Sequence, residues 1–325
     1  MGNRNKINMK AHPLRFLTAL FALPIFLLAA CTNYYKNDYR DTTPTSGKLN
    51  VYYDEGLSLH VENQAYTFEA LYADVDLTLF SSTENKAIEA LYQDSCEAIV
   101  ISRQLTDREK KVFANRNFEP KFSAVAKSGM ALIANVAAPI RSIDMDELIQ
   151  LLTGNAALID TSGQPLELKI LLDKNHSSIV HYVTDSLIGG SKLSSECSVL
   201  ASTIDAINYV AANKNTLALI DFAWLSDVDD SISRANRDKI KLIGVRRPGS
   251  LEVYYPSQSS FKLGTYPYTR TIYVYRKTGD FTIAKGFESF VAGPKGQVTF
   301  LKQGLLPTKQ QERSIHINME PIKIQ

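Results

Sequence analysis

A serine and an arginine directly follow a short apolar stretch at Ser102 and Arg103, and this pair is the clearest sign of chemistry in the sequence. The preceding residues, Ala98–Ile101, are apolar and partly β-branched, as in a strand buried on both faces of a parallel sheet. Thr106 and Glu109 have the spacing of a capping box, which predicts that a helix begins there. Ligands of open α/β sheets bind at the carboxyl ends of strands, where amides and a forked guanidinium can hold an anion. We therefore expect Ser102 and Arg103 to bind an anion; the alternative is an exposed arginine in a polar turn.

Ser82 lies at a second junction between a predicted strand and a predicted helix. It follows the apolar stretch 75–80, and Ser81 with Glu84 has the spacing of another capping box. A serine at such a position usually only caps its helix, and contact with a ligand is the alternative.

Ser177 and Ser178 lie at a third junction, between the apolar run 168–172 and a predicted helix. His176 and His181 invite the hypothesis of a serine hydrolase, but the sequence has no G-x-S-x-G elbow and no carboxylate at a telling spacing. We therefore expect solvated histidines. The sequence also lacks the H-E-x-x-H and C-x-x-C spacings of metal sites.

Length and composition predict two lobes rather than one. The 325 residues include 45% hydrophobic residues, enough for a large core, and the net charge is +2 with both signs mixed along the chain. Without a basic patch there is no electrostatic footprint for nucleic acid.

The first thirty residues are typical of a secretory signal rather than of the fold. Basic residues precede an uncharged apolar run, 16–30, which is interrupted by Pro24 and ends in L-A-A-C. This ending resembles the bacterial lipobox and implies cleavage before Cys31 and lipidation of its thiol, with an ordinary signal peptide as the alternative. Residues 31–47 are polar and contain proline, so they are predicted to form a flexible tether.

Three local features of the body lead to further predictions. Strands are expected at 122–126 and 130–136 with a turn between them, and a helix capped by Asp144 is expected to end at Gly154. Cys96 and Cys197 lie beside apolar segments in different predicted lobes. We expect both thiols to be buried and unpaired, although an oxidising envelope would permit a disulfide.

Four patterns in the body resemble the phosphate-binding subunit of bacterial phosphate ABC transporters. They are I-S-R-x-L-T-x-x-E at 101–109, the serine pair at 177–178, Y-P-x-x-R at 266–270 and G-F-x-x-F-V…G-Q…G-L-L-P at 286–307. The resemblance implies a two-lobed, type II periplasmic-binding-protein-like α/β fold, in which each lobe is a mixed sheet flanked by helices. Lobe 1 would comprise 48–126 and 266–325, and lobe 2 would comprise 127–265.

Carried over position by position, the resemblance implies a ligand held by hydroxyls, backbone amides and an arginine. The implied ligand-binding residues are Ser82, Ser102, Arg103, Asn175, Ser177 and Ser178. Four positions depart from the family pattern. A turn containing Asp54 replaces a glycine-serine turn, and Ile179 replaces a threonine. Asp173 stands where many relatives carry arginine, and Asn175 replaces the aspartate that accepts the phosphate proton.

These features together predict a solute-binding protein without enzymatic activity, cofactor or metal. It would be a monomeric lipoprotein, anchored by a palmitate-type lipid, that faces the periplasm or cell exterior and delivers inorganic phosphate or a similar oxyanion to ABC permease subunits. The alternative is a surface or periplasmic lipoprotein of the same fold that has lost transport and acts as a sensor or interaction module. Asp54 and Ile179 favour this alternative, whereas Ser102 and Arg103 favour transport.

Overall fold

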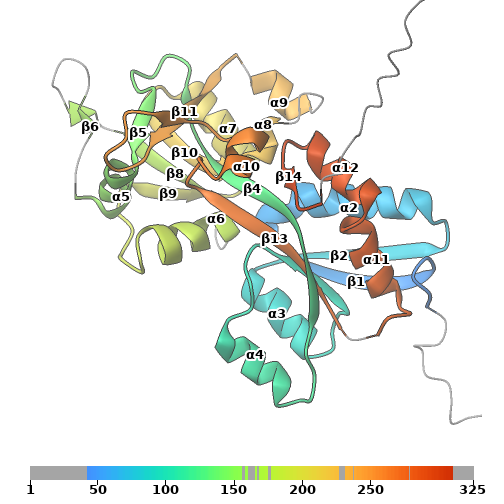
Figure 1. Ribbon diagram of the computed structural model, residues 1–325. Coiled ribbons are helices and arrows are strands. Elements are labelled where there is room, and N and C mark those ends of the chain that lie inside the picture. The colour runs from blue at the N-terminus through green and yellow to red at the C-terminus, as the bar shows by residue number, and fades with distance from the viewer. Residues whose placement is uncertain are drawn as a thin grey trace, which may run out of the picture. The chain divides into compact units, whose positions relative to one another are not determined.

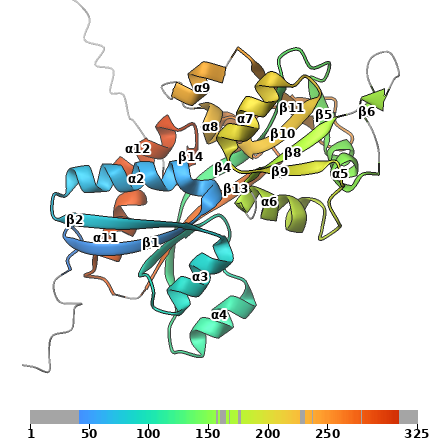
Figure 2. The same cartoon turned by 180° about the vertical axis from the view of Figure 1, so that it is seen from behind.

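The computed structural model describes residues 42–155, 158–159, 165–166, 168–174, 177–226, 231–236, 238–277 and 279–309. Contact clustering places all of them in one compact unit. Its main feature is a branched twelve-stranded sheet, whose central path runs β2-β1-β3-β13-β4-β10-β8-β9. Figure 1 and Figure 2 show β4 and β13 as the long strands that run from one half of the sheet to the other.

The strands along this path are β1 (Gly47–Asp54), β2 (Val75–Ser82), β3 (Ala98–Ile101), β4 (Lys121–Asn135), β8 (Lys169–Lys174), β9 (Cys197–Leu200), β10 (Thr216–Asp221) and β13 (Thr269–Arg276). Shorter strands are β5 (Ser142–Asp144), β11 (Ile240–Arg246), β12 (Val253–Tyr254), β14 (Leu306–Pro307) and the separate pair β6 (Leu158–Ile159) and β7 (Pro165–Leu166). Strands β1, β2 and β3 are parallel, as are β8, β9 and β10, whereas β13 is antiparallel to both β3 and β4.

The helices are η2 (Glu55–Leu57), α2 (Ser58–Leu71), α3 (Glu84–Tyr92), α4 (Asp107–Ala114), α5 (Met145–Thr153), α6 (Ser178–His181), η3 (Tyr182–Leu187), α7 (Thr203–Ala212), α8 (Ala223–Ser226), α9 (Ser231–Asn236), α10 (Gln258–Leu263), α11 (Ile283–Val291) and α12 (Pro294–Lys302). Helix η2 is a 3₁₀-helix and η3 is a π-helix. Within the described residues, no helix combines the length and apolarity needed to cross a bilayer.

The strands are apolar on both faces because helices cover both faces of each half of the sheet. In β3, Ala98 and Val100 pack against a cluster that includes α2 and α11, while Ile99 and Ile101 pack against α3 and α4. Side chains alternate between the faces of a strand, so a continuous apolar run is the pattern expected for such a layer. We call these two clusters the N-terminal core.

The second half of the sheet repeats this arrangement. In β10, Leu217 and Leu219 join a cluster with α5 and α6, while Ala218 and Ile220 join a cluster with α7. We call these two clusters the central core. Strand β4 contributes to both cores, because Val125 belongs to the N-terminal core and the residues after Gly129 belong to the central core.

The predicted turn at 127–129 is wrong, because β4 is continuous from Lys121 to Asn135. These three residues pair with Thr271, Arg270 and Thr269 of β13, so their backbone groups have a ladder partner. Glycine is needed at position 129 of this strand, because an added Cβ would lie only 2.5 Å from the ring of Phe261.

Other local predictions are confirmed. Thr106 and Glu109 form a reciprocal capping box, and Gly154 ends α5 in the left-handed conformation with φ of 74°.

The cap of α3 differs from the prediction, because Thr83 rather than Ser81 accepts the amide of Lys86. Strand β2 continues through Ser82, which moves the start of the helix. Cys96 and Cys197 are both free, the first buried and the second half-buried.

Candidate anion-binding site

Ser102 and Arg103 follow β3 as predicted, and both already bind a carboxylate of the protein itself. The amide and hydroxyl of Ser102 donate to Glu84 Oε1 over 2.8 and 2.9 Å. Arg103 Nε donates to Glu84 Oε2 over 3.2 Å. Glu84 is the first residue of α3 and is only 4% exposed. The donors that the sequence assigns to an external anion therefore have an internal acceptor.

The guanidinium of Arg103 is engaged on a second side by Glu109. Its two terminal nitrogens donate to the two Glu109 oxygens over 2.9 Å each, in a bidentate pair. Burial alone would raise the pKa of Glu109, but hydrogen bonds from Arg103 and Thr106 outweigh burial and lower it. Arg103 is thus shared between two carboxylates and has little charge left to offer a ligand.

The serine pair at 177–178 also contacts a carboxyl group of the protein itself, that of Asp54. Asp54 Oδ1 accepts the amides of Gly56 and Ser178, each over 2.9 Å. Asp54 ends β1 in the N-terminal core, whereas Ser178 begins α6 in the central core, so this carboxyl group bridges the two. The Ser177 hydroxyl instead caps α6 by accepting the amide of Val180.

Burial and, to a smaller extent, the nearby carboxylate of Glu84 raise the pKa of Asp54, which is about 7. Hydrogen bonding to Ser178 and the positive charge of Arg270 act against this rise. Asp54 is fully buried, and its second oxygen, Oδ2, has no hydrogen-bond partner among the described residues.

Arg270 supplies a second guanidinium, which the sequence reasoning did not include among the site residues. It is 7% exposed and donates to the hydroxyl of Ser178, to the carbonyl of Gly56 and, over 2.6 Å, to Asp221 Oδ2. Its Nε is buried without a partner within the described part of the chain. The sequence does contain a signal for Arg270, because it is the last residue of the Y-P-x-x-R pattern at 266–270.

Asp221, the last residue of β10, forms an ion pair with Arg270. It accepts the hydroxyl of Ser128 over 2.8 and 2.9 Å and the amide of Ala223 over 2.8 Å, and His60 Nε2 lies 3.4 Å from its Oδ1. Burial would raise the pKa of Asp221, but Arg270 and His60 hold it well below its usual value. Asp221 is therefore a buried anion whose partners come from both cores.

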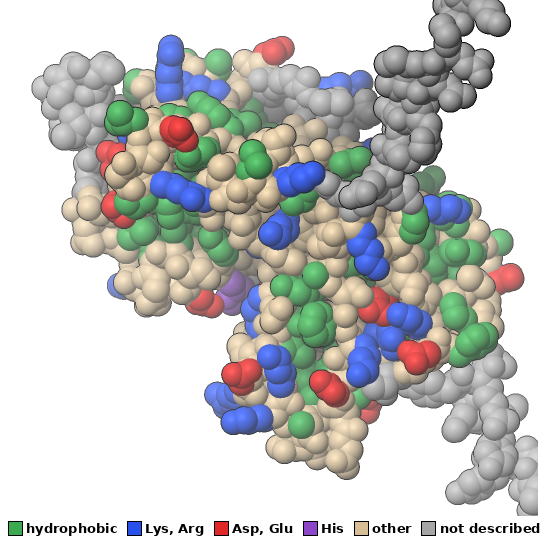
Figure 3. Space-filling view, viewed as in Figure 1, with side chains coloured by type: hydrophobic (Ala, Val, Ile, Leu, Met, Phe, Trp, Pro, Cys, Tyr) green, Lys and Arg blue, Asp and Glu red, His purple; other side chains and the backbone are tan. Residues whose placement is uncertain are grey.

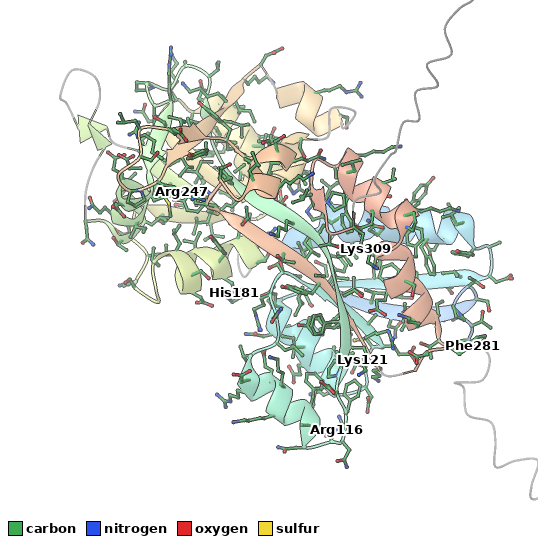
Figure 4. All side chains as sticks on the ribbon, in the orientation of Figure 1. Arg116, Lys121, His181, Arg247, Phe281 and Lys309 are labelled. Atoms are coloured by element: carbon green, nitrogen blue, oxygen red, sulfur yellow. The ribbon has the colours of Figure 1, made fainter. Side chains whose placement is uncertain are left out.

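The remaining predicted residues lie in different places. Ser82 is opposite Asp54 in the register of β1 and β2, and its hydroxyl donates to the carbonyls of Tyr53 and Thr83. Asn175 lies outside the described residues. Ile179 is fully buried in the central core, so it contributes an apolar contact. His181, labelled in Figure 4 at the end of α6, lies 4.0 Å from Asp185.

Charges outside the site are mixed in sign. Figure 3 shows Lys and Arg side chains interspersed with Asp and Glu on the face it presents. In the part of the chain that the structure describes, no group of His, Cys, Asp or Glu side chains is arranged to hold a metal ion.

Comparisons with known proteins agree with this architecture. The class is that of two-lobed binding proteins of the type II periplasmic fold, as the sequence predicts. The model of the PBP superfamily domain matches residues 42–295, and the chain belongs to that superfamily. A search of curated proteins found no significant match.

Two solved structures illustrate the likeness. One is assigned as a phosphate ABC transporter substrate-binding protein from Clostridium perfringens, solved with bound phosphate; the TM-score is 0.65, the identity 17%, and the match covers 81% of this chain and 100% of that one. The other is an ABC-type phosphate transport receptor from Vibrio cholerae, with a TM-score of 0.62, 15% identity and coverage of 79% and 99%. The predicted resemblance to phosphate-transporter binding proteins is confirmed, and at this identity it establishes the fold.

Proposed function

We propose that this protein is a solute-binding protein that captures an oxyanion, with inorganic phosphate as the first candidate, and delivers it to an ABC permease. The observation that carries the proposal is the meeting of hydrogen-bond donors from both cores at one place: the amides of Gly56 and Ser178, and the guanidinium of Arg270. Amides and a guanidinium together are the donors that oxyanions bind. Both solved relatives described above are phosphate transport proteins by name.

In this proposal the two cores are two lobes that separate and close. Lobe 1 comprises 48–126 with 266–325, and lobe 2 comprises 127–265. Strands β4 and β13 cross between the cores and would bend there as the lobes open. The protein would have no enzymatic activity of its own. Its signal sequence and a lipid on Cys31 would place it in the cell envelope, with residues 31–47 as the tether.

Calorimetric titration of the full-length chain with phosphate and with sulfate tests the proposal. We expect phosphate to bind, and Arg270→Met to weaken binding by roughly thirtyfold to several thousandfold, because a charge-assisted pair in a closed site is worth about 2 to 5 kcal/mol. Arg103→Met should cost less, since Arg103 is already paired with two carboxylates, Glu84 and Glu109, whereas Arg270 is paired with one, Asp221.

Arg246→Met is the matched control, because Arg246 pairs with Asp144 on the neighbouring strand β5 and both side chains are partly exposed, away from the site. Asn175→Asp should raise the preference for phosphate over sulfate, since a carboxylate accepts the phosphate proton better than an amide oxygen does. If the wild type binds neither anion, oxyanion transport loses its basis.

A second candidate function is favoured by one observation: Asp54 and Glu84 occupy the donors that an oxyanion would need. We infer from this that a lipoprotein of the same fold, acting as a sensor or interaction module without transport, is the alternative. It is distinguished by a folded wild type that binds neither phosphate nor sulfate.

A further inference from the structure

Asp54 makes the contacts that a bound anion would make. Its Oδ1 accepts two backbone amides over 2.9 Å, one from Gly56 two residues later and one from Ser178, which is 124 residues away. The carboxyl group is completely buried. Ser178 begins α6, so its amide has no acceptor within the helix, and Asp54 is the acceptor that the described residues provide.

Glu84 repeats this arrangement on the neighbouring donors. Its carboxylate accepts the amide and hydroxyl of Ser102 and the Nε of Arg103. The two carboxyl groups thus occupy donors from the serine–arginine pair at 102–103 and from the serine pair at 177–178, which the sequence assigns to a ligand. This coincidence points to substitution of the ligand rather than to incidental capping.

The fit of Asp54 is incomplete. Its Oδ2 and the Nε of Arg270 are both buried without a partner among the described residues, although Arg270 is close enough to influence the carboxyl group electrostatically. Buried polar atoms without partners are costly. A tetrahedral oxyanion has four oxygens where a carboxyl group has two, so an incoming oxyanion could use donors that Asp54 leaves unused.

We propose that Asp54 is an intramolecular ligand that holds the two cores together without a solute and competes with an oxyanion for the amides of Gly56 and Ser178. The proposal deepens the proposed function, because it names the group that an incoming oxyanion must displace. The role of Asp54 in the solute-free protein does not depend on which solute the protein binds, or on whether it binds a solute at all.

The simpler explanation is that Asp54 only caps the 3₁₀-helix η2. A cap requires the bond to Gly56 but not the bond to Ser178. Asp54→Ser separates the two roles, because a serine hydroxyl is also a good cap but is too short to keep both amides. The variant also gives this turn a neutral serine hydroxyl, as in the glycine-serine turn that the family resemblance implies.

Hydrogen–deuterium exchange of the full-length chain, without added anion, measures both amides. In Asp54→Ser we expect the Ser178 amide to exchange at least about tenfold faster than in the wild type, while the Gly56 amide changes little. Amides of β10 report whether the variant is folded. Asp144→Ser is the matched control: Asp144 is also a helix cap, but its partner Arg246 lies on β11, the strand that pairs with β5, so Ser178 should be unaffected. Unchanged exchange at Ser178 in Asp54→Ser overturns the proposal.

Titration with inorganic phosphate tests the competition separately. Removing an ionised carboxyl group from the place of an incoming anion should tighten phosphate binding at least about tenfold in Asp54→Ser at pH 8, above the Asp54 pKa of about 7, because like charges in contact cost several kcal/mol. Equal affinity in both proteins overturns the competition and leaves oxyanion binding intact. Faster exchange at Ser178 with no phosphate binding in either protein supports the internal ligand and refutes the proposed function.

Discussion

Replacing Asp54 by asparagine should change how stability depends on pH. The pKa of the buried Asp54 carboxyl is raised to about 7 from its usual value of 3.8, mainly by burial and then by Glu84. The charged groups around it are Glu84 on α3 and Arg270 on β13, and Arg270 is itself paired with Asp221 and, through Asp221, with His60. The folded protein therefore keeps a proton on Asp54 at pH values where the unfolded chain has lost it.

The sign and size of the effect follow from linkage. Between about pH 4 and pH 7 the folded state binds more protons at Asp54 than the unfolded state, so the free energy of unfolding falls as pH rises. The rise of the Asp54 pKa from 3.8 to about 7 corresponds to about 4 kcal/mol of the free energy of unfolding over this interval. Above pH 7 both states are ionised at this residue and the contribution becomes constant. Asparagine carries no titrating proton, so Asp54→Asn should lack this fall.

Urea unfolding, followed by circular dichroism from pH 4.5 to pH 8, measures the difference between wild type and Asp54→Asn. The free energy of unfolding of the variant should increase steadily relative to that of the wild type as pH rises, and the difference should level off near pH 7. Asp144→Asn is the control, because Arg246 lowers the pKa of Asp144 and its proton is lost before this interval begins. A difference that is constant across the interval, or that moves in the opposite direction, would refute the assignment of a raised pKa to Asp54.

Three other predictions concern stability and the cysteines. Asp221→Ala should lower the free energy of unfolding by about 3 to 5 kcal/mol, because it leaves the buried guanidinium of Arg270 without its carboxylate; a loss below about 1 kcal/mol in urea unfolding would contradict this. Palmitate labelling of cells should mark the wild type but not Cys31→Ser, and equal labelling of both would disprove the lipid anchor. Alkylation under denaturing, non-reducing conditions should modify both Cys96 and Cys197, since both are free, whereas protection of both would indicate a disulfide.

The sequence predicts best those features that neighbouring residues determine. The apolar run Ala98–Ile101, the cap at Thr106 and the donors Ser102 and Arg103 lie within twelve positions, and all appear where the local pattern places them. The turn predicted at Ser128 failed for the opposite reason. Its strand partner is β13, more than 130 residues away, and nothing near Ser128 indicates that pairing.

The acceptors of the site could not be predicted for the same physical reason. Serine and arginine side chains indicate that an anion is bound, but not whether that anion is a solute or a carboxylate of the chain. The sequence indicates Glu84 only as part of a cap, and Asp54 only as a departure from the family pattern that favours loss of transport. Only the register of β1 with β2 and the placement of α6 beside η2 bring these carboxyl groups onto the predicted donors.

The charges of the site connect ligand entry with opening. Arg103 is paired with Glu84 and Glu109, and Arg270 is paired with Asp221, so neither guanidinium has an unmatched positive charge. A phosphate added to this closed arrangement would bring one or two negative charges next to Asp54 in a buried site, where charge without a partner is costly. Binding therefore requires that Asp54 leave the amides of Gly56 and Ser178 or remain protonated. The Ser178 bond is one of the contacts that join the two cores, beside those of Arg270 and His60 with Asp221, so in the proposed function the release of Asp54 would favour separation of the cores.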